Sequence, residues 1–368
     1  GFHRETTAYA EGQRWFDGNY VRFRAGRPEN MRGYETRASG TTFDGSARDL
    51  LTWSDSDSKK RAIFGTPDKL YVNEGDVIYD ITPITTAVTL ANVFGTSSGS
   101  TRVCCSDAGH GRAVGDYVLF TSSAAFNAVS LQGNTYQVVS VDSANVFTIS
   151  VTGAANATGS DAGSATFNYY IPTGSSIAAA GLGYGAARYQ ATVCASQTRA
   201  WNQPASAGSS GIVFDITQWS LDNWGEDVVA NRKGSNIFYF DSDASVLPTR
   251  ATSVTTSPIK SNSIIVSPND RHLICLGTNE FAADATVSGT FNPMLVRWSD
   301  QDDRSNWVPS VSSTAGEVVL TDGTEIIGAV RSKNAINIWT DNSLWLMEFA
   351  GPPFTFRFTQ AGTNCGMV

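Results

Sequence analysis

The sequence has little charge for its size. Charged residues make up 16% of its 368 positions, against about 25% in ordinary soluble domains. A surface so poor in charge indicates that partner subunits cover much of it. The balance is acidic, with 34 Asp and Glu against 26 Lys and Arg and a net charge of −8. DNA binding through a broad basic face is therefore not expected.

Patterns that carry enzyme chemistry are also missing. There are three histidines and five cysteines, with no HExxH pattern and no zinc-ligand spacing of the cysteines. No GxSxG nucleophile motif occurs. From these absences we expect that the chain is not an enzyme and holds no cofactor. No run approaches 18 apolar residues, so we expect no membrane span.

Long runs of Glu, Lys, Leu and Ala at helical spacing are lacking, whereas glycine is abundant, with 34 residues. This composition predicts an all-β fold of many short strands and tight turns. The length exceeds the usual limit of one compact core, so two domains or one large repetitive fold are expected. The chain starts without methionine and ends at GTNCGMV, which suggests a piece of a longer polypeptide.

A repeated triplet of an aromatic residue, a hydroxyl residue and an aspartate organises the chain. It occurs at Trp53-Ser54-Asp55, Trp298-Ser299-Asp300 and Trp339-Thr340-Asp341, with looser relatives at Phe240-Asp241-Ser242 and Trp219-Ser220-Leu221-Asp222. A unit of ~40 residues built from a few antiparallel strands is the length of a β-propeller blade. We therefore predict a β-propeller-like body with the aromatic residues in its core and the aspartates as turn caps. A β-sandwich of unrelated hairpins is the alternative.

Residues 84–172 lack the repeated triplet. They are poor in charge and consist of six short alternating segments separated by Gly-rich and Asn-rich turns. This pattern predicts a small β-barrel or sandwich inserted in a loop of the first blade. The expected division is an N-terminal arm with the first strands at 1–48, the first blade at 49–83, the inserted module at 84–172, and the remaining blades at 173–368 with a Gly/Ala-rich loop at 173–191.

The stretch WSDQDDRSNW, residues 298–307, holds three aspartates between two tryptophans. Asp300, Asp302 and Asp303 could form a polar turn, a calcium site or a catalytic cluster. An aspartate at the end of a strand accepts hydrogen bonds from turn N–H groups, and this explains the pattern without a ligand. An EF-hand loop would need Gly at its sixth and Glu at its twelfth position, and a glycosidase would need two carboxylates facing a cleft. We interpret the stretch as a turn and keep the metal site as the weaker alternative.

The segment VRFRAGRPE carries a cluster of cations. Alternation along a strand places Arg22 and Arg24 on one face, and Arg27 is expected in the turn that follows. Salt bridges to acidic neighbours or to another subunit would explain these arginines. Docking on an acidic adaptor protein, or contact with DNA phosphates, is the alternative.

Several longer stretches resemble a family of tailed-bacteriophage virion proteins. They are EGQRWFDGNYVRFRAGRPENMRGYE, KLYVNEGDVIYDITP, WSLDNWGEDVVANRKGSNIFYFD, and LVRWSDQDDRSNWVP through GPPFTFRFTQAGTNCGMV. The inserted segment, with DAGHGRAVGDYVLF and LQGNTYQVVSVDSANVFTI, resembles a small β module that recurs in phage tail proteins. A propeller with insertions is similar to the nozzle protein of short-tailed phages.

This resemblance implies a structural protein of the virion, synthesised in the host cytoplasm, that forms a homo-oligomeric and hexameric ring in the tail. Such a nozzle or hub closes the DNA channel and opens for genome ejection. Its partners would be the adaptor or portal proteins, tail fibres or spikes, and genomic DNA in transient, non-specific passage.

A receptor-binding or glycan-binding tail protein is the first alternative, and a glycan-degrading enzyme is the second. The glycan-binding alternative needs exposed aromatic rings, so burial of Trp53, Trp298 and Trp339 would remove its best residues. The enzyme would be supported if polysaccharide cleavage were lost on substituting Asp300, Asp302 and Asp303 by alanine in a folded protein.

Overall fold

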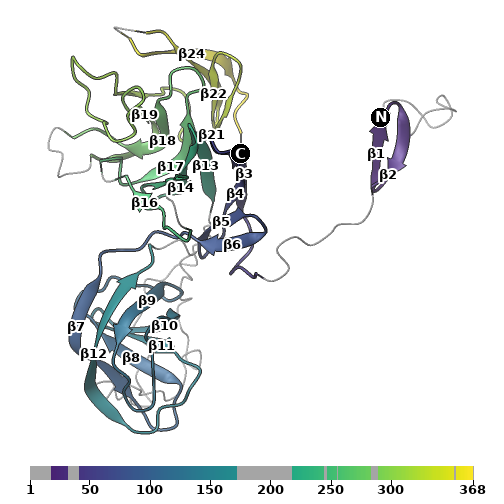
Figure 1. The fold of residues 1–368 in the computed structure, drawn as a ribbon. Helices are drawn as coiled ribbons and strands as arrows, with labels where there is room; N and C mark the ends of the chain where they lie inside the picture. Colours follow the sequence, from purple (N-terminus) through teal and green to yellow (C-terminus); the bar gives the residue numbers. More distant parts are fainter. Residues whose placement is uncertain are drawn as a thin grey trace. The chain divides into compact units, whose positions relative to one another are not determined.

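A computed structural model describes residues 18–31, 41–171, 218–243, 247–254, 256–282, 289–351 and 354–367, without the side chains of 161 and 162. The expected Gly/Ala-rich loop at 173–191 lies outside these ranges. Strands are the regular secondary structure of the described residues, so the predicted all-β class is confirmed (Figure 1). Within the same ranges no helix is long and apolar enough to cross a membrane. The chain divides into two units, Gly1–Thr42 and Phe43–Val368.

The described part of the first unit is one β-hairpin. Strand β1 (Val21–Arg24) pairs antiparallel with β2 (Arg27–Asn30). Ala25 and Gly26 form the two-residue turn, with φ angles of 47° and 77°. A two-residue turn with positive φ at both positions matches the twist of the flanking strands.

The described residues of the second unit form four antiparallel sheets of four strands, each made of strands that are consecutive in the chain. The first sheet holds β3 (Asp49–Ser54), β4 (Lys60–Gly65), β5 (Leu70–Glu74) and β6 (Val77–Asp80); the second holds β13 (Trp219–Trp224), β14 (Asp227–Arg232), β15 (Ile237–Phe240) and β16 (Thr252–Ser253). The third holds β17 (Ser261–Val266), β18 (Leu273–Asn279), β19 (Phe291–Trp298) and β20 (Gly316–Val319); the fourth holds β21 (Ile326–Arg331), β22 (Ile336–Thr340), β23 (Ser343–Phe349) and β24 (Phe356–Thr363).

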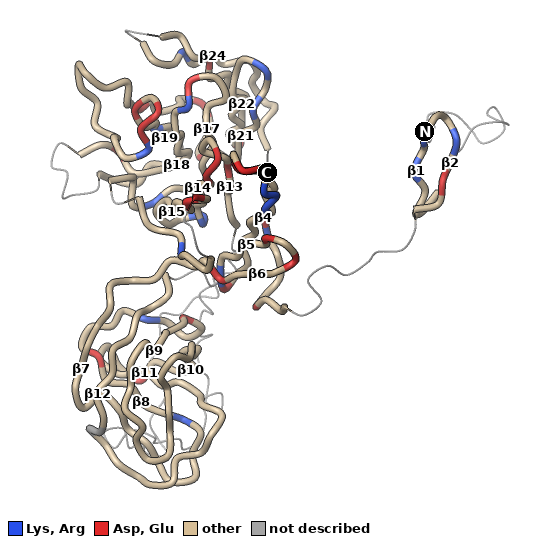
Figure 2. Tube along the Cα trace, viewed as in Figure 1, with Lys and Arg blue, Asp and Glu red and all other residues tan. Residues whose placement is uncertain are grey.

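A closed six-stranded barrel is inserted between the first and second sheets. Its strands are β7 (Val88–Thr96), β8 (Arg102–Ser106), β9 (Tyr117–Ser123), β10 (Thr135–Ser143), β11 (Val146–Ser150) and β12 (Gly159–Tyr169). Side chains alternate between the interior and the surface along a strand, and an aromatic core that includes Phe94, Phe120 and Phe147 fills the barrel. Figure 2 shows few Lys, Arg, Asp or Glu residues along its strands.

Successive sheets pack face to face over three separate apolar cores. Trp53, Trp219 and Phe238 are buried between the first and second sheets. A second core contains Trp224 and Leu273 and joins the second sheet to the third. The third core, with Trp298, Ile338 and Phe356, joins the third sheet to the fourth. In the part of the chain that the structure describes, no such core joins the fourth sheet to the first. The body is thus a series of blade-like sheets with two outer faces.

The core between the first and second sheets depends on a close approach at Gly65. Trp219 donates from its indole Nε1 to the carbonyl of Thr66 at 2.8 Å, so its ring lies flat over the end of β4. A Cβ built on Gly65 would lie 2.3 Å from the Trp219 ring. Glycine at this position therefore lets the backbone of one sheet receive the tryptophan of the next.

Substituting Gly65 by alanine is expected to lower the free energy of unfolding by about 1–3 kcal/mol, because the methyl group forces the two sheets apart. Chemical denaturation measures this difference. Gly328→Ala is the matched control, since Gly328 also lies in a strand and an added Cβ there meets nothing within 4 Å. Equal losses in the two variants would contradict the role of the Gly65–Trp219 contact.

Candidate functional site

The loop that follows β19 is organised around the Asp300 carboxylate. Asp300 accepts hydrogen bonds from the backbone N of Gln301 at 2.9 Å and of Thr314 at 2.7 Å. The Thr314 hydroxyl donates to the same carboxylate at 2.6 Å, and the Asn306 amide donates at 3.1 Å. Asp300 thereby holds the start of this loop against the residues before β20.

The two neighbouring aspartates point to other partners. Asp302, in the left-handed region at φ 61°, pairs with Arg271, with 2.7 Å between Oδ1 and the guanidinium Nε. Asp303 accepts from the Ser305 backbone N at 2.8 Å and from its hydroxyl at 2.6 Å. Across the described ranges, no three His, Cys, Asp or Glu side chains are grouped so that they could hold a metal ion. The three aspartates singled out as metal candidates are therefore not brought together.

Hydrogen bonding makes two of these carboxylates stronger acids. Burial alone would raise the pKa of Asp300, but the hydrogen bonds from Thr314, Gln301 and Asn306 outweigh it and lower that pKa below 3.8. The hydrogen bonds from Ser305 lower the pKa of Asp303 in the same way. A carboxyl group whose pKa is lowered by folding stabilises the fold at any pH above its pKa in the unfolded chain. This contribution is lost as the pH falls through its pKa in the folded chain.

The Asp300→Asn variant is expected to unfold about 1.5 kcal/mol more easily at pH 7, since an amide cannot replace all the accepted hydrogen bonds and the site is partly open to water. The difference from the unsubstituted chain should shrink as the pH falls below about 3.8, where the unfolded carboxyl is protonated. Urea unfolding at pH 7 and pH 3 measures both effects. Asp241→Asn serves as the control for an exposed turn aspartate, and a difference that is equal at the two pH values would refute the assignment.

A series of buried, hydrogen-bonded polar side chains lies behind this loop. The fully buried His272 contacts the Thr314 hydroxyl through Nε2 at 3.0 Å. Its Nδ1 is hydrogen-bonded to Asp270, and the Ser267 hydroxyl donates to the same carboxylate. A hydroxyl, an imidazole and a carboxylate in series are the groups of a nucleophilic relay. Here, however, the Thr314 hydroxyl already donates to Asp300, so this series of hydrogen bonds fixes the loop to the start of β18.

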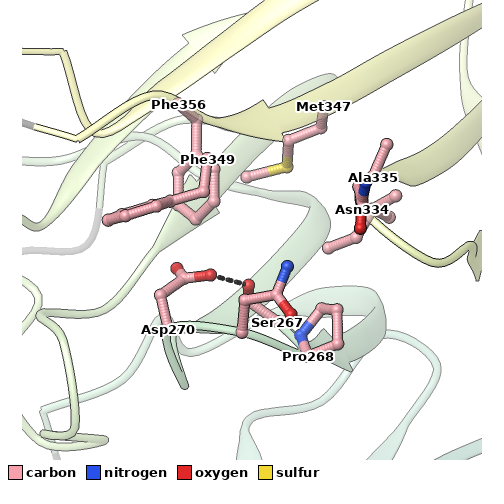
Figure 3. Close-up of a pocket in the computed structure, with 10 residues that line it drawn as sticks. Ser267, Pro268, Asp270, Asn334, Ala335, Met347, Phe349 and Phe356 are labelled. Atoms are coloured by element: carbon pink, nitrogen blue, oxygen red, sulfur yellow. Dashed lines mark hydrogen bonds between the residues drawn. The ribbon is translucent and has the colours of Figure 1, made fainter.

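A small cavity adjoins this series of polar side chains. Figure 3 shows Ser267 and Asp270 on one wall, with Met347, Phe349 and Phe356 facing them. Its volume is about 10 Å³, which is room for a single water molecule. A sugar ring does not fit into it.

The aromatic residues of the repeated triplet do not share one environment. Trp53, Phe240 and Trp298 are buried in the cores between sheets. Trp339 was also expected in the core, and this prediction is wrong, because the side chain is only half-buried. It alternates with Ile338, which faces the third sheet, so Trp339 lies on the outer face of the fourth sheet.

The triplets also occupy different strands of their sheets. Trp53 lies in β3, the first strand of its sheet, Trp298 in β19, the third, and Trp339 in β22, the second. The spacing of Trp298 and Trp339 is therefore not a structural period. The pattern describes a strand that ends in a polar turn, and every strand of an antiparallel sheet ends in that way.

The aspartates of the triplets differ in their partners too. Asp55 is buried and lies 3.0 Å from the Arg61 guanidinium. Asp241 accepts from the backbone N of Asp243 at 3.0 Å. Asp341 accepts from the backbone N of Thr324 at 2.7 Å. Asp55 also accepts from the backbone N of Lys59 at 2.8 Å, so all three aspartates bind turn backbone and Asp55 is in addition part of a buried ion pair.

The three arginines of the N-terminal hairpin lie on its exposed surface (Figure 2). Arg22 pairs with Glu29 on the neighbouring strand, at 3.0 Å. Arg24 is directly opposite Arg27 in the register of β1 and β2. Arg27 is thus the first residue of β2 rather than a turn residue. Two of the three cations lie side by side, and Glu29 pairs with the third.

The sequence patterns gave His272 no functional role and missed its place at the centre of this hydrogen-bonded series. The local signal is the spacing Ser267-x-x-Asp270-x-His272 in a turn between two apolar strands. That spacing brings a hydroxyl, a carboxylate and an imidazole together. The fourth member, Thr314, is 42 residues further along the chain and carries no local signal.

No family model matches the chain, and no curated protein matches it. Among solved structures it matches the endosialidase of phage phi92, with 14% identity and a TM-score of 0.22. The match covers 92% of this chain and 53% of that one, so the chain spans about half the length of the structure it matches.

The endosialidase match corrects one expectation from the sequence. The absence of familiar catalytic motifs led us to predict that the chain is not an enzyme, and this prediction is contradicted by a match to a protein named as an enzyme. The prediction depended on motifs of particular enzyme classes, and carboxylates brought together from distant strands leave no such motif. At this identity and TM-score the match does not transfer catalytic residues to this chain.

Proposed function

We propose that this chain is a structural component of a bacteriophage tail that forms a ring, closes the DNA channel and opens for genome ejection. The observation that carries the proposal is the burial of tryptophans between neighbouring sheets. Trp53, Trp224 and Trp298 are all buried where one sheet packs on the next. The sequence stretches that resemble phage virion proteins include Trp224 and Trp298, so at these two positions the shared pattern is one of sheet-on-sheet construction.

The charge of the chain suits a conduit for DNA. A protein that neutralises phosphates gains affinity with each contact, and every such contact must break when the genome moves. A net charge of −8 would let DNA slide past the ring. The Arg22–Arg24–Arg27 surface is small and lies on the N-terminal hairpin, where it would dock on an acidic adaptor or portal protein. Tail fibres or spikes would be the other neighbours in the virion.

Sedimentation velocity of the purified full chain tests the ring directly. We expect a single closed assembly at micromolar concentration, with six copies as the number that the resemblance implies. A chain that remains monomeric up to the highest soluble concentration would contradict the proposal.

Receptor or glycan binding is the alternative that the exposed aromatic residues can still support. Burial of Trp53 and Trp298 removes two of its three tryptophans, which leaves Trp339 and the 75% exposed Phe354. Binding to host glycans that is lost in Trp339→Ala and Phe354→Ala would favour this alternative. Cleavage of a host polysaccharide by the purified chain would favour the glycan-degrading enzyme.

A further inference from the structure

The fourth sheet has an apolar outer face that resembles the inner faces of the other sheets. Its apolar residues are Ile327, Val330, Trp339, Leu344 and Leu346, and the polar Asn337 lies among them, paired with Val330 and Leu346. Trp339 and Leu344 are paired across β22 and β23, and Val330 is 58% exposed. Gly328 is opposite Trp339 on β21, and a Cβ built there would meet nothing within 4 Å. At Gly65, by contrast, the same space is filled by a tryptophan of the next sheet.

The order of the sheets indicates what packs on this face. Trp53 of the first sheet packs towards the second, Trp224 of the second towards the third, and Trp298 of the third towards the fourth, while Trp219 of the second sheet packs back towards the first. Trp339 continues the series, because it points from the fourth sheet away from the third. The series predicts another sheet packed on Trp339, in continuity with the three interfaces that already exist.

The first sheet has the matching outer face. Leu50 is 60% exposed and is paired with Phe64, on the side away from the core that holds Leu51 and Trp53. Phe43 packs on Phe64 at this face, with 5.0 Å between the ring centroids, so Leu50 rather than Phe64 offers the exposed apolar surface. Strand alternation places Lys60 on the same side. Arg48 precedes β3 by one residue, and both cations are exposed.

Charge favours the contact of these two faces. Asp341 and Glu348 alternate with Trp339 and Leu346 on the outer face of the fourth sheet, and Glu348 is paired with Arg357. The fourth-sheet face is therefore acidic by one charge, whereas the first-sheet face carries Arg48 and Lys60. Opposite charges around an apolar contact steer two surfaces together and set their register.

We infer that the outer face of the fourth sheet binds the outer face of the first sheet of a second copy of this chain. The contact is head-to-tail, and repetition of a head-to-tail contact produces a closed ring when the rotation closes. The inference rests on the proposed function, which it deepens by naming the two surfaces that join one copy to the next.

Site-specific crosslinking tests the pairing of the two faces. Leu50→Cys and Val330→Cys are placed in separate full-length preparations, both carrying Cys365→Ser to remove the exposed native thiol. The preparations are mixed and treated with a short bifunctional maleimide. We expect a crosslinked dimer that contains one chain of each kind. Val311→Cys in place of Leu50→Cys is the control, since that side chain is fully exposed in a loop outside both faces, and it should give no such dimer.

A charged substitution in the apolar face provides the second readout. Trp339→Lys should weaken assembly at least tenfold, as expected for a central aromatic residue of an interface, while the circular dichroism spectrum stays unchanged. An unsubstituted chain that assembles, with no Leu50→Cys to Val330→Cys crosslink and no effect of Trp339→Lys, would overturn the inference and leave the ring intact. An unsubstituted chain that stays monomeric would instead contradict the proposed function itself.

Discussion

Replacing Arg61 by alanine is expected to lower the free energy of unfolding by about 3–5 kcal/mol, because it leaves a buried carboxylate without its partner. The side chains of Arg61 and Asp55 are 4% and 3% exposed and lie 3.0 Å apart. Arg61 also donates to the carbonyl of Ser242 at 2.7 Å, so the ion pair ties the first sheet to the second. Denaturant unfolding of the variant measures the loss.

A double-mutant cycle isolates the pair. The Asp55→Ala and Arg61→Ala losses should not add in the double variant, since removal of both partners leaves no unpaired charge at the fully buried site. Glu74, the second carboxylate bound to Arg61, is 30% exposed and reaches water. Arg22→Ala is the control, because the Arg22–Glu29 pair is exposed and such pairs contribute at most about 1 kcal/mol. Additive losses at Asp55 and Arg61 would show that the two residues do not act as a buried pair.

Trp298→Ala is expected to lower the free energy of unfolding by a similar amount, about 3–5 kcal/mol. The ring is 6% exposed and meets Phe356 of the fourth sheet edge-on, with 5.2 Å between the ring centroids. Its Nε1 donates to the Thr314 carbonyl at 2.8 Å. Removal therefore opens a cavity and leaves that carbonyl without its donor.

Trp339→Ala is the matched control for Trp298→Ala, because each tryptophan begins one copy of the repeated triplet. Measured at a protein concentration low enough to keep the chain monomeric, it should cost less than half as much, since Trp339 is only half-buried. Equal losses of the free energy of unfolding would mean that both tryptophans have the same structural role. That result would contradict the placement of Trp298 in a core and of Trp339 on an outer face.

Strand alternation explains how much of the fold the sequence predicts. Tyr117-Val118-Leu119-Phe120 in β9 alternates between half-buried and buried side chains, because one face of a small barrel is filled and the other is exposed. The signal is weaker in β8 and β11, where three buried side chains follow one another. The all-β class follows from such segments, and the absence of long helical runs agrees with it.

Long-range packing explains what the sequence could not predict. Trp298 and Trp339 share one motif, yet which face of a sheet is covered depends on a neighbouring sheet that the motif does not encode. His272 is buried by Thr314 and by the rings of Phe349 and Phe356, residues that are far from it in the chain. The turn role of Asp300 was easier to predict, because its partners Gln301 and Asn306 are close to it in the sequence.

Electron cryo-microscopy of the phage particle tests the central claim most directly. The account predicts density for this chain as a closed ring around the tail axis, with the four-sheet bodies packed from the fourth sheet of one copy to the first sheet of the next. Density for isolated copies away from the tail axis would contradict it.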